Sequence, residues 1–301
     1  MIKVDHLTLK YPSGKGIFDL NFSIGQGKVM GYLGPNGAGK TTTIRALMGF
    51  MRADSGSCQI DGLDCYKDAA KIKKNLGYIP GEIAFPSGMN CDQFLKYQCE
   101  LRGLKDLTRM HQLTQRFELD AKGSIKRFSK GMKQKLGIIT AFMHDPAVLI
   151  LDEPTSGLDP LMQKNFIDLV LEEKKRGKTI LMSSHMFEEV ERTCDDVLII
   201  KDGHIMAQSD IATLKSSKRK GYVVHTEDVA ALAQMGFELG EVDAASATVY
   251  VRGEEIDDFI KKLSTIHVTG LDIMTQNLED IFMNFYGKGS QAASQTGKEQ
   301  N

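Results

Sequence analysis

GPNGAGKT, residues 34–41, is the strongest single signal in this 301-residue sequence. It matches the pattern G-x-x-x-x-G-K-[ST], and it lies between a strand predicted at 28–33 and a helix predicted from Lys40 to about Met51. Its glycines allow tight backbone turns, so successive amide groups point inward at a helix N-terminus and form a nest for an anion. The stretch therefore predicts a phosphate-binding loop in an α/β fold.

The residue types of this loop predict how it holds a phosphate chain together with a metal ion. Lys40 supplies a positive charge for the outer phosphates, and Thr41 offers its hydroxyl to Mg²⁺. The residues that we expect to bind the ligand share this loop and the first turn of its helix: Asn36, Gly37, Ala38, Gly39, Lys40, Thr41 and Thr42.

Two further apolar runs end in side chains that suit the same ligand. VLILDEP (148–154) predicts a buried strand that ends in Asp152 and Glu153, and TILMSSH (179–185) predicts one that ends at His185. Ligands of α/β folds bind at the carboxyl ends of the strands. We therefore expect Asp152 to hold Mg²⁺, directly or through water, Glu153 to polarise the water that attacks the γ-phosphate, and His185 to orient that water.

The remaining pattern predicts an α/β architecture around this loop. Short apolar runs alternate with helices, which indicates a mostly parallel core sheet buried on both faces. The alternating stretches 2–10 and 17–24 predict an antiparallel β subdomain, and apolar residues at three- and four-residue spacing predict a helical subdomain at about 85–145. Asp159 and Pro160 predict the capped start of a helix after VLILDEP.

The composition changes near KSSKRKG, residues 215–221, which predicts a domain boundary. We expect a nucleotide-binding domain at 1–215, a small α+β accessory domain at 216–287 and a disordered polar tail at 288–301. The strands and helices predicted for the accessory domain alternate along the chain, at 222–226, 228–236, 247–251, 255–264, 267–274 and 277–286.

Composition also bounds the class of protein. The net charge of −1 gives no general attraction to nucleic acid, and we expect no nucleic-acid partner. No run approaches the roughly 20 apolar residues that a membrane-spanning helix needs, and the N-terminus is too charged for a signal peptide. The five cysteines contain no CxxC pair, which predicts reduced thiols in a cytosolic protein rather than a disulfide framework or a structural zinc site.

Five motifs, in family order, resemble those of the ATP-binding subunit of ATP-binding-cassette (ABC) transporters. GPNGAGKT resembles the family's Walker A, VLILDE its Walker B, SGLD (156–159) its D-loop, SSH its switch histidine, and FSKGM (128–132) its signature, usually LSGGQ. The resemblance covers residues 1 to about 215 and implies a P-loop ATPase fold that uses ATP and Mg²⁺. It also implies that Tyr11, in LKYPSG, stacks on adenine and that Asp159 belongs to the nucleotide site.

The same resemblance implies a dimer. In this family two such domains pack head to tail, and the signature of one closes over the nucleotide in the Walker A of the other. Ser129 and Gly131 are therefore expected to contact the γ-phosphate held by a second cassette, in a homodimer or a heterodimer. Lys130 and Met132 depart from the family's usual glycine and glutamine.

A second departure lies in YIPGEIAF, residues 78–85. Gly81 stands where the family normally has a glutamine that touches Mg²⁺ and couples the site to the membrane subunit. Either Glu82 or a water molecule takes the place of that glutamine as a metal contact.

The variant motifs PGE and FSKGM, with the ending LEDIFMNFYG (278–287), resemble ATPases of bacterial exporters for drugs, antimicrobial peptides and lipid-linked compounds. These are encoded apart from their membrane subunits, which implies a separate transmembrane permease and a peripheral place at the cytoplasmic face of the membrane. The helical region 85–125 would then carry the groove for that subunit's coupling helix.

The leading hypothesis is a subunit that powers export by ATP-driven dimer closure. The alternatives are a soluble ABC-type ATPase switch acting on a macromolecular complex and a binding module without hydrolysis; the transported substrate is not encoded in these motifs.

Overall fold

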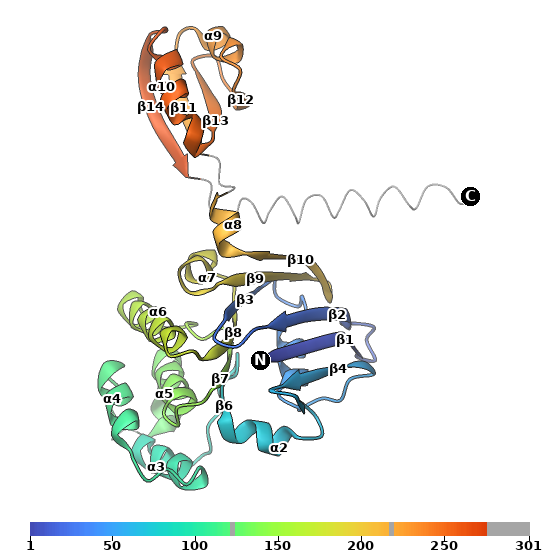
Figure 1. Cartoon of the computed structure of the whole chain (residues 1–301). Coiled ribbons are helices and arrows are strands. Elements are labelled where there is room, and N and C mark those ends of the chain that lie inside the picture. The colour runs from blue at the N-terminus through green and yellow to red at the C-terminus, as the bar shows by residue number, and fades with distance from the viewer. Residues whose placement is uncertain (121–123, 217–219, 276–301) are drawn as a thin grey trace, which may run out of the picture. The chain divides into compact units, whose positions relative to one another are not determined.

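The computed structural model describes three stretches of the chain, residues 1–120, 124–216 and 220–275 (Figure 1). The chain divides into two compact units, Met1–Ile211 and Ala212–Asn301, which are described separately below. The predicted helix 277–286, the motif 278–287 and the predicted tail 288–301 lie outside the described residues.

The first unit is built on a six-stranded sheet. Its strands are β3 (Val29–Leu33), β6 (Leu76–Ile79), β7 (Val148–Asp152), β8 (Thr179–Ser184), β9 (Asp196–Lys201) and β10 (His204–Asp210). The order is β10-β9-β3-β8-β7-β6, and every neighbouring pair is parallel except β9 with β10. Every residue of β3, β7 and β8 is buried, as expected for strands with both faces covered. The predicted mostly parallel sheet is confirmed.

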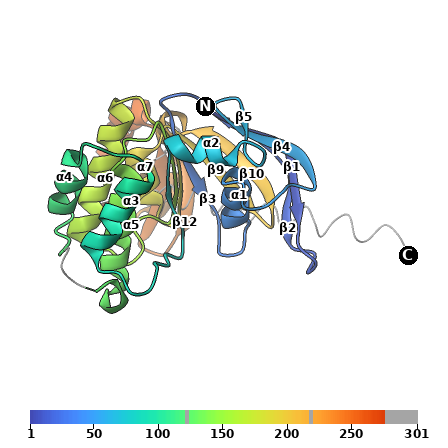
Figure 2. The same cartoon turned by 90° about the horizontal axis from the view of Figure 1, so that it is seen from below.

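Helices cover both faces of this sheet. They are α1 (Lys40–Leu47), α2 (Ala69–Ile72), α3 (Cys91–Leu101), α4 (Thr108–Arg116), α5 (Lys130–Phe142), α6 (Pro160–Lys175) and α7 (Phe187–Thr193). Figure 2 shows α3, α4, α5 and α6 on one side of the sheet and α1 and α2 on the other. Helix α1 ends earlier than the predicted Met51, because Gly49 adopts a left-handed conformation (φ 66°) directly after it.

A second, antiparallel sheet completes the first unit. Its strands, in the order β2-β1-β4-β5, are β1 (Ile2–Lys10), β2 (Gly16–Ile24), β4 (Ser55–Ile60) and β5 (Leu63–Asp64). The buried side chains of β1 and β2 alternate along each strand and join Ile44 and Leu47 of α1 and Tyr32 of β3 in one core cluster. This core holds α1, and with it the phosphate loop, against both sheets.

The second unit is a split βαβ arrangement. After α8 (Ile211–Ser216), its elements are β11 (Lys220–Thr226), α9 (Val229–Gln234), β12 (Glu238–Val242), β13 (Ser246–Val251), α10 (Ile256–Leu263) and β14 (Val268–Thr275). The four strands form an antiparallel sheet in the order β12-β13-β11-β14. Tyr222, Val249 and Phe259 belong to its buried core. The predicted strands and helices between 222 and 274 are confirmed, whereas β12 was not predicted.

No helix among the described residues combines the length and the apolar character needed to cross a membrane.

Candidate functional site

The phosphate loop encloses a cavity at the carboxyl end of β3. The cavity has a volume of ≈ 160 Å³ and is lined by consecutive residues of the loop together with one acid from the end of β7: Pro35, Asn36, Gly37, Ala38, Gly39, Lys40, Thr41, Thr42 and Glu153. Gly39 has φ 114°, a conformation that strongly favours glycine, and it precedes the first residue of α1. The loop residues predicted from the sequence therefore surround one space, and Glu153 faces it from a different strand.

Lys40 is held inside this loop. Its Nζ donates hydrogen bonds to the carbonyl oxygens of Gly34, at 2.5 Å, and Pro35, at 3.2 Å, and the residue is only 6% exposed. Burial lowers the pKa of Lys40 from its usual value, while the carboxylates of Glu153 and Asp152 act in the opposite direction. Burying an ammonium is costly unless an opposite charge compensates it, so an anionic ligand in this cavity would stabilise the charged form of Lys40.

Asp152 connects the loop to the neighbouring strands. Its Oδ2 accepts a hydrogen bond from Thr41 Oγ1 at 2.9 Å, and its Oδ1 accepts one from Ser183 Oγ at 2.5 Å. Asp152 is 1% exposed and lies opposite Ser183 in the parallel register of β7 and β8. Among the described residues, no group of three or more His, Cys, Asp or Glu side chains is placed to hold a metal ion. The hydroxyl of Thr41 and the carboxylate of Asp152 suit Mg²⁺ because this ion prefers oxygen ligands, commonly takes few from the protein and completes its shell with phosphate and water.

Glu153 has an unusual backbone conformation that directs it to the cavity. Its φ of 48° lies in the left-handed region, which is uncommon for a residue with a side chain. Its amide donates to both the carbonyl oxygen of Ser183, at 3.2 Å, and Ser183 Oγ, at 3.0 Å. The Nδ1 atom of His185 lies 3.6 Å from Glu153 Oε2, and the His185 side chain is 61% exposed. The structure thus brings Glu153 and His185 together, as their strand-end positions predicted.

Ser183 is a site residue that sequence reasoning missed. It donates to Asp152 and accepts from the amide of Glu153, so one hydroxyl orients both acids. The available signal was its place at the end of β8, next to the strand that ends in Asp152.

Two residues predicted for the site, Tyr11 and Glu82, do not line the cavity. The half-buried Tyr11 places its hydroxyl 3.4 Å from Thr42 Oγ1 and 3.3 Å from the sulfur of Met51. Glu82 is exposed on the loop after β6, whereas its neighbour Gly81 approaches the acid: a Cβ at position 81 would lie 3.1 Å from Asp152 Oδ2. The roles of Tyr11 in adenine stacking and of Glu82 in metal binding stay predictions.

Ser129, Gly131 and Asp159 lie at helix starts and do not line the cavity. Ser129 caps α5, where its Oγ accepts a hydrogen bond from the amide of Met132 at 3.2 Å. Asp159 caps α6 in the same way, with its Oδ1 accepting from the amide of Met162 at 3.0 Å. The predicted cap is confirmed, and the cavity is formed without any of these three residues.

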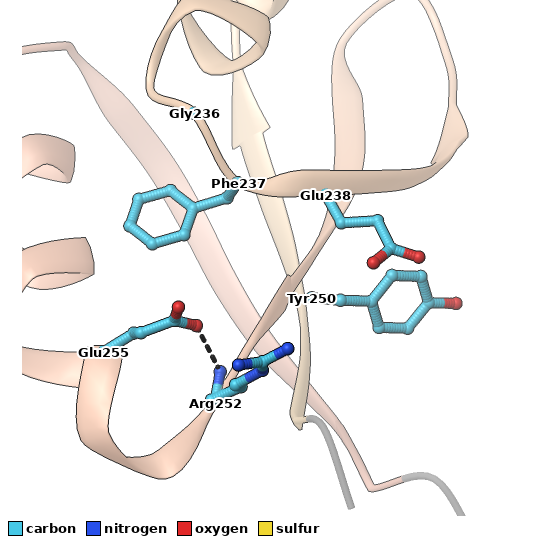
Figure 3. A pocket seen from close by; sticks show the side chains of 6 residues that line it. All are labelled: Gly236, Phe237, Glu238, Tyr250, Arg252 and Glu255. Carbon is cyan, nitrogen blue, oxygen red and sulfur yellow. Dashed lines mark hydrogen bonds between the residues drawn. The ribbon is translucent and has the colours of Figure 1, made fainter.

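The second unit contains a hollow of similar volume, ≈ 160 Å³, shown in Figure 3. Its lining combines an aromatic pair with three charged side chains, and consists of Gly236, Phe237, Glu238, Tyr250, Arg252 and Glu255. Glu255 stabilises the local backbone, because its Oε2 accepts a hydrogen bond from the amide of Arg252 at 3.0 Å. This hollow has no phosphate loop and no pair of acids at strand ends.

Comparison with known proteins agrees with this site. Residues 17–156 match the family model described as "ABC transporter". A bacitracin transport ATP-binding protein of Bacillus licheniformis is 31% identical over 301 residues, covering 96% of this chain and 98% of that protein. A Nod factor export ATP-binding protein of Ralstonia nicotianae is 30% identical, with 96% and 94% covered. A solved ATP-binding subunit of an ABC transporter has a TM-score of 0.66 at 29% identity, covering 71% of this chain and 92% of that chain.

The parallel sheet, the phosphate loop and the acids at the strand ends define an ATPase of the P-loop class. The chain belongs to the ABC transporter family, as one of its ATP-binding and ATP-hydrolysing subunits. The family, the fold class and the ATPase activity expected from the motifs are thereby confirmed.

Proposed function

We propose that this subunit powers export through a separate membrane permease, at the cytoplasmic face of the membrane. The full-length alignments to proteins named for bacitracin transport and Nod factor export support this assignment. The observation that carries the mechanism is structural: the described chain assembles the Walker A cavity with Asp152 and Glu153 but leaves Ser129 outside it.

Each residue of the cavity has a defined task in this proposal. The loop amides and Lys40 bind the phosphates, and binding replaces the carbonyl contacts of the ammonium with phosphate oxygens. Thr41 and Asp152 would hold Mg²⁺, which would supply positive charge to the phosphates, and Glu82 is the candidate for an additional contact. Glu153 accepts the proton of the attacking water, and His185, close to that carboxylate, orients the water and the γ-phosphate.

The second half of each site comes from another cassette. Ser129 and the amide of Gly131, at the start of α5, contact the γ-phosphate bound by the partner, and Asp159 lies next to this junction. A second copy of this chain is the simplest partner, because a two-fold symmetric dimer uses the same pair of surfaces twice. Binding of ATP closes the dimer and hydrolysis opens it, which is a population shift between two states.

The test is purification of the tagged chain from its native membranes, followed by an ATPase assay of the complex. We expect an integral membrane protein to remain in stoichiometric amount and Glu153→Gln to reduce turnover by more than about 100-fold, the contribution of a general base. The same variant should still bind ATP in an equilibrium assay. A stoichiometric soluble complex instead of a membrane protein would favour the alternative of a soluble ATPase switch, which the names of the relatives do not support.

A further inference from the structure

Helix α5 is fastened to the loop that follows β7. This loop, residues 153–158, begins with Glu153 and includes the SGL of the D-loop motif. The contacts come from two side chains and one close backbone approach, and all of them arise in the first turns of α5. Lys130, one of the two departures of this chain from the usual signature, is one of these two side chains.

Lys130 lies against its own loop. Its Nζ donates a hydrogen bond to Ser156 Oγ at 2.8 Å. Its aliphatic stem covers Gly157: a Cβ built on that glycine would lie 3.0 Å from both Cγ and Cδ of Lys130. The side chain therefore packs along the loop and directs its charge to Ser156, instead of projecting freely from the helix start.

Two further contacts lie beside Lys130. A Cβ on Gly131 would lie 2.7 Å from the carbonyl oxygen of Gly157, so only glycine permits this approach of the two backbones. One turn along the helix, Gln134 is 4% exposed and donates its Nε2 hydrogen to the carbonyl oxygen of Pro154 at 2.7 Å. The same nitrogen lies 3.4 Å from the carbonyl oxygen of Glu153.

The backbone of the loop turns twice. Glu153 has φ 48° and Gly157 has φ 81°, both in the left-handed region. Inside the loop, the amide of Ser156 donates to the carbonyl of Glu153, and the amide of Leu158 donates to that of Thr155. The contacts of Lys130 and Gln134 hold these two turns from outside the loop.

We propose that Lys130 is a positioning residue for ATP hydrolysis: it fastens the 153–158 loop to the start of α5, so that Ser129 and Glu153 keep a fixed relation. Resting on the proposed function, this makes α5 a link between two sites. Ser129 contacts the nucleotide bound by the partner, while the loop held by Lys130 and Gln134 carries the general base of its own site. Closure of one site is thereby transmitted to the acid of the other.

The test compares hydrogen exchange and ATP turnover in the full-length chain with those in Lys130→Met, which keeps an unbranched side chain of high helix propensity but removes the ammonium. We expect the loop amides of Ser156 and Leu158 to exchange about five-fold faster, the effect of losing one exposed charged hydrogen bond with its packing. We expect kcat to fall by a similar factor, with KM for ATP changed by less than about two-fold because binding residues are untouched.

Three further variants make the result specific. Lys130→Arg should restore protection and turnover, because a guanidinium can donate to the same hydroxyl. Lys133→Met, three residues further along α5, is the matched control and should behave as the parent chain. Adding Ser156→Ala to Lys130→Met should produce no further change, because both substitutions remove the same hydrogen bond, from Lys130 to Ser156.

Two results would overturn the proposal. Unchanged exchange of the loop in Lys130→Met would show that the contact does not hold it. A raised KM with unchanged kcat would mean that the ammonium binds nucleotide directly. Glu153→Gln in the same series separates this proposal from the function itself: if that variant still hydrolyses ATP, the assigned general base is wrong, whatever Lys130 does.

Discussion

At the scale of single residues, Ser183 shows how one hydroxyl can orient two acids. It donates to Asp152 and accepts from the amide of Glu153, and these bonds join the metal ligand to the general base. We expect Ser183→Ala to lower kcat by about ten-fold, because a hydrogen bond to a charged group contributes ~1.5–3 kcal/mol. Affinity for ATP should change little, since the phosphate loop is intact. Steady-state turnover and binding of a fluorescent ATP analogue measure the two effects.

A neighbouring serine provides the control for this prediction. Ser184 follows on the same strand but donates to Glu189 Oε2, at 2.9 Å, away from the two acids. Ser184→Ala should reduce stability without reducing turnover per folded molecule. Equal losses of turnover in the two variants would show that the serines act only through packing of β8.

For a whole helix, the start of α6 offers a test of stability. The side chain of Asp159 caps this helix, and the family resemblance also implies that Asp159 belongs to the nucleotide site. We expect Asp159→Ala to lower the free energy of unfolding by about 1 kcal/mol, the usual contribution of a cap, whereas Asp159→Asn should keep the cap. Denaturant titration measures this difference. If Asp159→Asn is as stable as the parent but hydrolyses ATP more slowly, the carboxylate has a role in the site beyond capping.

The end of α5 predicts a pH dependence of stability. His144 lies just beyond this helix, with its Nε2 3.2 Å from the carbonyl oxygen of Leu76 in β6. Burial, and secondarily the charge of Arg102, lowers the pKa of His144 from 6.5 to about 4. Between these values the unfolded chain binds a proton that the folded chain does not. The free energy of unfolding must therefore fall as the pH decreases from 6.5 towards 4.

The size of this effect follows from the same shift. Between about pH 7 and pH 5, we expect the free energy of unfolding to fall by about 2 kcal/mol more in the parent chain than in His144→Gln. A difference of one bound proton between the two states changes this free energy by ~1.4 kcal/mol for each pH unit. Glutamine can still donate to the carbonyl of Leu76, so the variant mainly removes the titration. Urea titrations at both pH values measure the difference, and parallel losses in the two proteins would contradict the assignment.

For the molecule as a whole, the mostly parallel sheet and the place of the phosphate loop could be predicted, because apolar runs, glycine-rich loops and strand-end acids are local patterns, whereas the order of the strands within the sheet was not predicted. Lys40, Asp152, Glu153 and His185 were found in this way. The link between Lys130 and Ser156 was not, since it depends on a long-range approach between a helix start and a loop. Strand β12 was missed for a different reason: four of its five residues are exposed, so no alternation marks it.

The division of the site between two molecules is the property of the whole assembly that remains to be tested. In our proposal, Lys40→Met disables the nucleotide pocket of its own chain, whereas Ser129→Arg disables the pocket of its partner. A mixed dimer of the two variants contains one pocket with both defects and one with neither. At equal amounts, half of the dimers are mixed, so we expect the mixture to recover about one quarter of the parental rate.

The mixture gives this result only if the halves of a site come from different copies of this chain. Each variant alone should be inactive. Ser129→Arg also removes the cap of α5, so we expect its free energy of unfolding to be lower by about 1 kcal/mol. ATPase rates are measured for each variant and for mixtures at constant total concentration, where recovery should be greatest at equal amounts. If the mixture is no faster than the sum of the separate variants, a second copy does not complete the pocket. If Ser129→Arg alone matches the parental rate, the contact of Ser129 with the partner's nucleotide has no part in the mechanism.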